Sequence, residues 1–383
     1  RFKRMYYSYI KIIFLIVFSS LILISIINFF VDPEQVYPKL FSNTNPVLKK
    51  FSKELTSSKY GIINKFGKLN ERDRKKALAM FSEDADCAIF GSSHIMEISS
   101  FREDKSLTKY CKSIINLGVS GGTLEDYYAF SNMLLENKHT IGTIVFGLDP
   151  WSLKFNMDQR WNKIKNDFDK MKNRLKIKSQ YPNSSYTVSL ILNLINLEYL
   201  IESLDKLTSE DRLKDKDKDK DKETFIHAEK FDINKGISGS AVTLPDGSWA
   251  YSSEYINEQK LYIKIYDGFH GITYKISQLV GARWYDDNAI NDLTNLVIFL
   301  QSKFNIIFVM TPYHPKVWEH QQPTVEAMKS IENKVHMLAK QLNITVIGSY
   351  NPVKIGCSKD EFFDGMHATS KCLKKLERKV LKR

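Results

Sequence analysis

The sequence of 383 residues lacks several common signatures of function. It has no internal repeat, no Walker loop and no G-x-G-x-x-G segment, so it does not indicate the nucleotide sites built on those patterns. Its four cysteines form no C-x-x-C pair, which argues against a zinc site, and we expect neither a metal nor a cofactor. Cys87 and Cys111 lie in or beside expected strands and are interpreted as buried thiols. Cys357 and Cys372 could pair in an oxidising compartment.

The first residues, in contrast, hold a long apolar run. Residues 12–31 include no charged side chain over 20 positions, the length that a helix needs to cross about 30 Å of hydrocarbon. Basic residues precede the run and an acidic residue follows it, namely Arg1, Lys3, Arg4, Lys11 and Asp32. This asymmetry predicts a cytoplasmic amino terminus and an outside location for the rest of the chain. A cleaved signal peptide is the alternative, but its apolar region is shorter, at roughly 7 to 15 residues. We therefore expect an uncleaved single-pass anchor.

The formal net charge of +12 is spread over many lysines, and nucleic-acid binding is not expected of a domain outside the membrane. The basic tail at 371–383 predicts a terminal helix with a solvated basic face. A docking surface for anionic lipid or glycan is the alternative interpretation of that tail.

Short apolar runs begin after residue 86 and are rich in Ile and Val. Because they are apolar throughout, they are typical of strands buried on both faces. The expected strands are 87–90, 113–117, 143–148, 305–310 and 344–347. Helical patterns lie between them, as at 124–138 and 323–342. This alternation predicts an α/β fold with a doubly wound parallel sheet of about five strands.

The chain is expected to have four parts. Residues 1–31 would form a cytoplasmic stub with the transmembrane anchor, and residues 32–80 a juxtamembrane stalk. The sheet domain would consist of 81–150 and 290–383, interrupted by a largely helical insertion at 151–289. Within the insertion, the alternating charges at 214–222 predict a solvated segment. Asp246-Gly247 predicts a hairpin turn.

Polar residues follow each expected strand, at the edge where open α/β sheets bind ligands. The first strand ends in Gly-Ser-Ser-His at 91–94, and the second in a glycine-rich segment at 118–122. Asp364 and His367 are spaced as D-x-x-H, which places both side chains on one side of a turn. His367 could accept a proton from a serine while Asp364 orients the ring. The structural alternative is that these serines and Asp364 only cap helices, and that His94 is a surface residue.

These blocks resemble the SGNH (GDSL-like) hydrolases, in particular their membrane-anchored DltD-like and AlgX/AlgJ-like branch. The resemblance covers roughly 81–150 and 290–383 and implies a three-layer, flavodoxin-like fold. It makes Ser93 the nucleophile, with Ser92 as a residue that positions the backbone, and implies an oxyanion hole built from Ser93 and Gly121. Where the family has a second donor, an Asn, this sequence has "GLDPW". Asp149 is the nearest candidate, although an ionised carboxylate cannot donate.

The resemblance also implies a function. The outside domain would transfer an acyl group, in particular acetyl, to a bacterial cell-surface polysaccharide through an acyl-serine intermediate. Because acetyl donors such as acetyl-CoA are cytoplasmic, a multi-pass membrane-bound O-acyltransferase would be the partner that delivers the group. Trp151, His314 and Trp318 are expected at the rim of the site, where packing or substrate contact would explain them. The alternatives are a carbohydrate O-acetyl esterase and a non-catalytic polysaccharide-export or binding protein with the same fold.

Overall fold

The computed structural model describes residues 2–32, 45–63, 69–82, 85–137, 140–155, 157–176, 191–214, 225–228, 241–266, 285–320 and 322–381. The chain divides into two compact units. One consists of Arg1–Ser42 and Tyr181–Thr224, and the other of Asn43–Gln180 and Phe225–Arg383. The alternating charged run at 214–222 lies outside the described residues except for Lys214.

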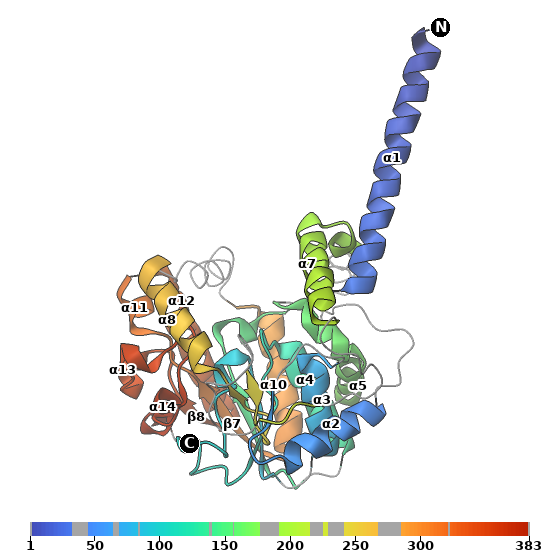
Figure 1. The fold of residues 1–383 in the computed structure, drawn as a ribbon. Coiled ribbons are helices and arrows are strands. Elements are labelled where there is room, and N and C mark those ends of the chain that lie inside the picture. The colour runs from blue at the N-terminus through green and yellow to red at the C-terminus, as the bar shows by residue number, and fades with distance from the viewer. Residues whose placement is uncertain are drawn as a thin grey trace. The chain divides into compact units, whose positions relative to one another are not determined.

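The first unit contains two long helices, α1 (Phe2–Val31) and α7 (Leu197–Lys214). The segment Tyr9–Val31 of α1 is long and apolar enough to cross a membrane. Most side chains of this segment are exposed, from Tyr9 to Leu23 in particular, whereas Asn28 near its end is buried. In Figure 1, α7 lies beside the carboxyl-terminal end of α1.

The second unit is an α/β fold around a six-stranded sheet with the order β3-β2-β4-β7-β8-β9. Five strands are parallel, and only β9 (Val380–Leu381) is antiparallel to its neighbour. The parallel strands are β2 (Cys87–Phe90), β3 (Ile114–Asn116), β4 (Thr143–Gly147), β7 (Asn305–Met310) and β8 (Thr345–Gly348). The prediction of a five-stranded parallel sheet is thus confirmed, as are the five apolar runs that form it.

Helices cover one face of the sheet and short, irregular segments cover the other. Successive side chains of a strand point to opposite faces. Phe90 of β2 packs on Tyr127 and Phe130 of α4 (Leu124–Glu136), whereas Ile89 points to the opposite face. There it joins a core formed by residues 95–111 and 355–376. Like α4, which precedes β4, the connecting helices α10 (Asp287–Gln301) and α12 (Gln322–Leu342) each lead into the next parallel strand, β7 and β8.

Both pairs of cysteines form disulfides. Cys357 pairs with Cys372, as the sequence allowed, and Cys87 pairs with Cys111. The expectation that Cys87 and Cys111 are buried thiols is therefore wrong. The turn that ends at Cys111 returns the chain to the start of β2, where the N–H of Cys87 donates to the carbonyl of Ser113. This return brings the two Cα atoms within 5.6 Å, a normal disulfide separation.

The compact unit extends beyond the predicted sheet domain at both boundaries (Figure 1). Part of the predicted stalk belongs to it, as α2 (Asn45–Ser57) and α3 (Glu71–Phe81). The start of the predicted insertion also belongs to it, as the 3₁₀ segments η2 (Pro150–Leu153) and η3 (Gln159–Ile164) and helix α5 (Lys165–Leu175). The reason is packing, since Phe168 of α5 contacts Tyr128 of α4.

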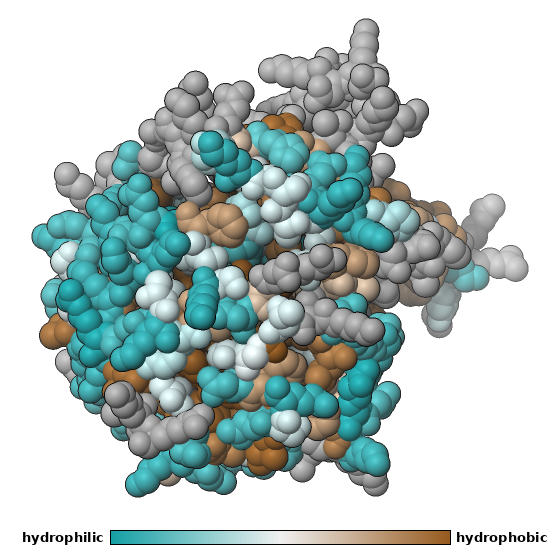
Figure 2. Space-filling view, turned by 90° about the horizontal axis from the view of Figure 1, so that it is seen from below, coloured by the Kyte–Doolittle hydropathy of each residue, from teal (hydrophilic) through white to brown (hydrophobic). Residues whose placement is uncertain are grey.

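Smaller elements complete this unit. The predicted turn at Asp246-Gly247 is confirmed, because the N–H of Gly247 donates to the carbonyl of Leu244 between two paired strands. The small sheet consists of β1 (Ile62–Ile63), β5 (Val242–Thr243) and β6 (Trp249–Ala250). Further helices of this unit are α8 (Ser253–Tyr266), α11 (Pro315–His320), α13 (Pro352–Ile355) and η5 (Lys359–Glu361). Hydrophilic residues cover much of the face of this unit seen in Figure 2, with small apolar areas between them.

The carboxyl-terminal tail is not the single helix that the sequence predicted. It forms α14 (Ser370–Leu373), the 3₁₀ segment η6 (Leu376–Arg378) and then β9. Val380 pairs with Ile347 of β8. The tail therefore closes one edge of the sheet, and its hydrogen bonds to β8 outweigh the helical pattern of Leu373, Leu376 and Val380.

Candidate active site at the carboxyl edge of the sheet

The turn after β2 places Ser92 and Ser93 differently. Ser92 is buried and caps the 3₁₀ segment η1 (Ser93–Ile95), since its Oγ accepts a hydrogen bond from the N–H of His94 at 3.2 Å. Ser93 is partly exposed at the first position of that segment. The hydroxyl of Ser93 is thus left to make a contact outside its own turn.

That contact is with His367. The Oγ of Ser93 lies 2.7 Å from Nε2 of His367, and Nδ1 of the same ring lies 2.6 Å from Oδ2 of Asp364. The three side chains form one continuous hydrogen-bonded chain, although 274 positions separate Ser93 from His367. In the arrangement that these contacts favour, Nδ1–H donates to the carboxylate and Nε2 accepts from the serine hydroxyl.

Asp364 holds its own loop as well as the imidazole. Its Oδ1 accepts the N–H groups of Met366 and His367 at 2.7 and 2.6 Å. The loop is also closed by pairing between Phe362 and Ala368. Since one carboxylate oxygen binds the backbone and the other binds the ring, the D-x-x-H spacing fixes the direction of the His367 side chain.

The two charges perturb each other. Burial alone would lower the pKa of His367, but the nearby carboxylate of Asp364 outweighs it, and the pKa of His367 is raised above 6.5. Burial would raise the pKa of Asp364, yet His367 and the two N–H donors outweigh it, and this pKa is lowered. Asp364 is therefore ionised at neutral pH and stabilises the imidazolium that proton transfer would create.

A glycine-rich loop lies against the serine turn. A Cβ at Gly122 would lie 2.3 Å from the carbonyl oxygen of Gly91 and 3.1 Å from Cα of Ser92, so only glycine permits this approach. Gly121 has a φ of +61°, and a Cβ there would meet the carboxylate of Asp158. Among the residues that the structure describes, no group accepts the N–H of Ser93 or of Gly121.

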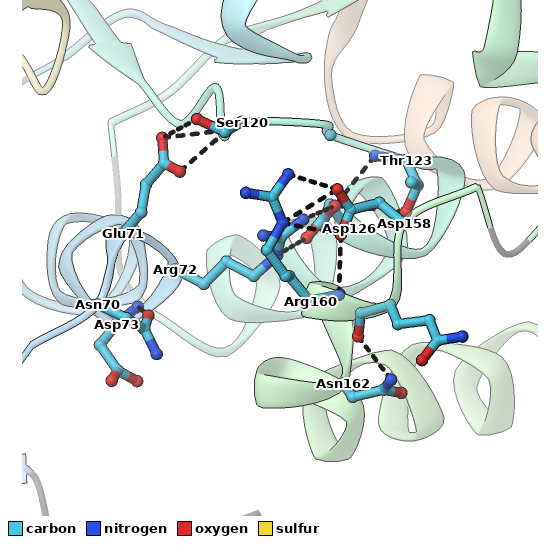
Figure 3. Close-up of polar contacts among 12 residues, drawn as sticks. Asn70, Glu71, Arg72, Asp73, Ser120, Thr123, Asp126, Asp158, Arg160 and Asn162 are labelled. Carbon is cyan, nitrogen blue, oxygen red and sulfur yellow. Dashed lines mark hydrogen bonds and ion pairs between the residues drawn. The ribbon is translucent and has the colours of Figure 1, made fainter. Parts of the chain in front are cut away.

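Buried ionic contacts hold this loop in place (Figure 3). The carboxylate of Glu71 accepts the N–H of Ser120 at 3.0 Å. Arg72 binds Asp126 through two parallel hydrogen bonds of 2.8 and 2.9 Å, and Asp126 in turn accepts the N–H of Thr123. Glu71 and Arg72 belong to α3, in the segment that the sequence assigned to a stalk. The charged sequence of this segment is typical of an exposed helix, so it did not indicate that Glu71 and Arg72 hold the glycine-rich loop.

Asp149 does not occupy a donor position. Its Oδ1 lies 3.0 Å from Nδ1 of His94, and both side chains are buried. His94 is thus not the surface residue expected from the sequence. Its ring contacts the rings of His367, Tyr313 and Trp151, with centroids 5.0, 5.0 and 5.4 Å away. Asp149 therefore acts on the site through His94.

The three predicted rim residues lie in different surroundings. Trp151 is next to the site, because its Nε1 donates to the carbonyl of Gly122 at 3.2 Å. His314 is buried near the loop that carries Asp364, where its backbone N–H donates to the carbonyl of Gly365. Burial lowers the pKa of the His314 side chain. Trp318 donates to the carbonyl of Tyr350. The described contacts connect Trp151 and His314, but not Trp318, to the loops that carry the site.

Three aromatic residues beside His367 were not found from the sequence. Phe363 stacks on the His367 ring with a centroid distance of 5.4 Å and an interplanar angle of 4°. Tyr251 packs on Phe363 at 4.9 Å and on Tyr255 at 5.5 Å. Both tyrosines are partly exposed and come from the predicted insertion. Phe363, Tyr251 and Tyr255 thus form a row of aromatic rings that begins at His367.

No group of side chains suited to hold a metal ion occurs among the described residues. No family model matches this chain, and no curated protein matches it either.

Proposed function

We propose that this chain is a serine-dependent acyltransferase of the SGNH type, which transfers an acyl group, in particular acetyl, to a cell-surface polysaccharide. The observation that supports it is the hydrogen-bonded chain from Ser93 through His367 to Asp364 at the carboxyl edge of the parallel strands. A serine hydroxyl is a weak nucleophile unless a neighbouring base removes its proton. His367 is positioned to do this.

The first half-reaction forms an acyl-serine. Oγ of Ser93 attacks the carbonyl carbon of the acyl donor while its proton passes to Nε2 of His367. The N–H groups of Ser93 and Gly121 stabilise the oxyanion, and such a donor typically contributes about 3 kcal/mol. The tetrahedral intermediate then expels the donor's oxygen, which takes the proton from His367. Asp364 remains ionised throughout and stabilises the imidazolium.

The second half-reaction transfers the acyl group to a sugar. A hydroxyl of the polysaccharide gives its proton to His367 and attacks the acyl carbon. Collapse of the second tetrahedral intermediate returns the proton to Oγ of Ser93. The partly exposed tyrosines Tyr251 and Tyr255 supply flat apolar surface on which a sugar ring could pack.

The proposed location is outside the cytoplasm of a bacterial cell, with α1 as the membrane anchor. The two disulfides favour an oxidising compartment. Because activated acetyl donors are cytoplasmic, the proposed partner is a multi-pass membrane-bound O-acyltransferase that delivers the acyl group across the membrane.

Reaction with a fluorophosphonate tests the proposed nucleophile. The probe should modify wild-type protein at Ser93, and Ser93→Ala should remove the label. Ser57→Ala changes an exposed serine at the end of α2 and serves as the control that retains labelling. Absence of label from folded wild-type protein would leave the non-catalytic interpretation.

The product distinguishes transfer from hydrolysis. Purified protein is supplied with an acyl donor and an oligosaccharide, and the acyl group is followed by proton NMR. Acylated oligosaccharide is the expected product, whereas free acetate alone would identify an esterase. In cells, Ser93→Ala should abolish O-acetylation of the surface glycan while the protein remains in the membrane fraction.

A further inference from the structure

The end of the apolar helix α1 is held by a second segment of the same unit. The side-chain amide of Asn28 donates to the carbonyls of Asn193, Leu194 and Asn196 at 3.1, 3.0 and 3.1 Å. Its Oδ1 accepts from the hydroxyl of Ser203 at 3.2 Å. The carbonyl of Leu194 lies at the end of the helical stretch at 191–194, where helices leave such groups without an internal partner, whereas those of Asn193 and Asn196 also accept the N–H groups of Asn196 and Leu200. Asn28 therefore caps that stretch from the side of α1.

A second contact fixes the following helix. The hydroxyl of Tyr199 donates to Asp32 at 2.6 Å, directly after the last residue of α1. The ring of Tyr199 is buried and packs against Phe29 and Leu194. Tyr199 and Ser203 lie four positions apart on α7 and both face α1, so this side of α7 is occupied.

The other side of this segment exposes apolar residues. Leu197, Ile201 and Leu204 follow the i, i+4, i+7 spacing of one helix face, while Glu198, Glu202 and Asp205 lie on another. The short stretch before α7 also exposes apolar side chains. The exposed fractions are Ile191 56%, Leu192 55%, Ile195 44%, Leu197 64%, Ile201 60% and Leu204 45%. We call these six residues the interfacial patch.

The last turns of α1 expose apolar side chains as well. Phe30 and Ile26, in the last turns of α1, are 78% and 48% exposed, and α7 lies beside that end of the helix (Figure 1). About 20 helical residues cross the hydrocarbon core, and the apolar segment of α1 is 23 residues long. The level of Asn28 consequently lies near the boundary between hydrocarbon and headgroups.

We propose that the interfacial patch lies in the membrane interface, where it inserts into the lipid at the outer end of α1. A segment with one apolar face and one charged face binds in the plane of the interface by burying the apolar face below the headgroups. The bonds of Asn28 and Asp32 satisfy the polar groups at that depth, which would otherwise be costly in lipid. This inference depends on the proposed membrane anchor and not on the proposed chemistry.

Fluorescence in vesicles tests this contact on the full chain. All four cysteines are in disulfides, so an introduced cysteine is the only free thiol for an environment-sensitive dye. Ile201→Cys reports on the interfacial patch. Glu202→Cys, exposed on the same helix, is the matched control, and Ile16→Cys reports on the middle of α1. Vesicles contain phosphatidylethanolamine and phosphatidylglycerol, with or without a spin-labelled lipid.

We expect the dye at Ile201 to emit at shorter wavelength, to be quenched by spin-labelled lipid and to be protected from iodide in the water. The dye at Glu202 should show the opposite pattern. Equal iodide quenching at both sites, with the Ile16 dye quenched by lipid, would overturn the proposed contact while leaving the anchor intact. Protection at Ile201 from both quenchers would indicate a protein partner instead. An Ile16 dye that is accessible to iodide would contradict the anchor itself.

Discussion

His94 and Asp149 form a buried pair beside the contact between Ser93 and His367, with Nδ1 of His94 3.0 Å from Oδ1 of Asp149. The pair joins the turn after β2 to the end of β4, and the edge of the His94 ring meets His367. The resemblance made Asp149 the nearest candidate for a second oxyanion donor. In the structure its carboxylate lies against the ring of His94, which packs on His367.

Breaking this pair should destabilise the protein more than removing both partners together. Asp149→Ala removes the carboxylate beside Nδ1 of His94 and leaves only the longer contact with Thr311, at 3.5 Å, so we expect a cost of about 2 kcal/mol. The double variant with His94→Phe should cost less than the sum of the two single changes, because each single change leaves one buried member of the pair behind and the double variant leaves neither. Urea unfolding of all four proteins measures the coupling. The exposed pair Asp104–Lys374 is the control and should show almost none, and additive effects at the buried pair would contradict this role.

The rate of fluorophosphonate labelling should depend on pH through His367. The base form of His367 is needed, and its pKa is raised above 6.5 by Asp364, so the rate should rise with pH through a midpoint above 6.5. Asp364→Asn retains an oxygen for the N–H groups of Met366 and His367 but removes the charge. We expect the midpoint to move to lower pH and the rate at high pH to fall roughly 10⁴-fold. An unchanged midpoint would show that Asp364 does not act on His367.

Gly122 and Gly142 provide a matched test of the glycine-rich loop. A Cβ at Gly122 would collide with the carbonyl of Gly91, whereas a Cβ at Gly142 meets nothing within 4 Å. Gly122→Ala should separate the loop from the serine turn and reduce the labelling rate by at least about 10²-fold, the loss expected for one oxyanion donor. Gly142→Ala should leave the rate unchanged. If both variants react like wild type, the loop does not contribute to an oxyanion hole.

The strands could be predicted because a strand buried on both faces is apolar at successive positions, as at 306–310. The candidates Ser93, Asp364 and His367 could be named because polar residues follow those runs at one edge of the sheet. The partner of Cys87 could not, since it depends on the turn that ends at Cys111. The burial of His94 was missed for a similar reason, because its partner Asp149 is a distant residue that only the assembled sheet brings near.

The last prediction concerns Lys75 of α3, which is buried in the sheet unit. Its Nζ donates to the carbonyls of Asn116, at the end of β3, and Gly247, at the tip of the hairpin, at 3.0 and 2.5 Å. Burial lowers the pKa of Lys75 from 10.5 to about 8, even though Glu71 and Asp246 favour the charge. Lys75 therefore joins three elements that the sequence places in different parts of the chain.

Between pH values of about 8 and 10.5 the unfolded chain binds more protons at Lys75 than the folded chain. Stability should consequently rise with pH across this window. Lys75→Met keeps an unbranched side chain but removes the titration, and it leaves two buried carbonyls without a donor. We expect this variant to be less stable throughout, with a deficit relative to wild type that grows from the lower to the upper end of the window. Urea unfolding at both ends measures the difference, and a deficit that stays constant with pH would show that the pKa of Lys75 is not lowered in the folded protein.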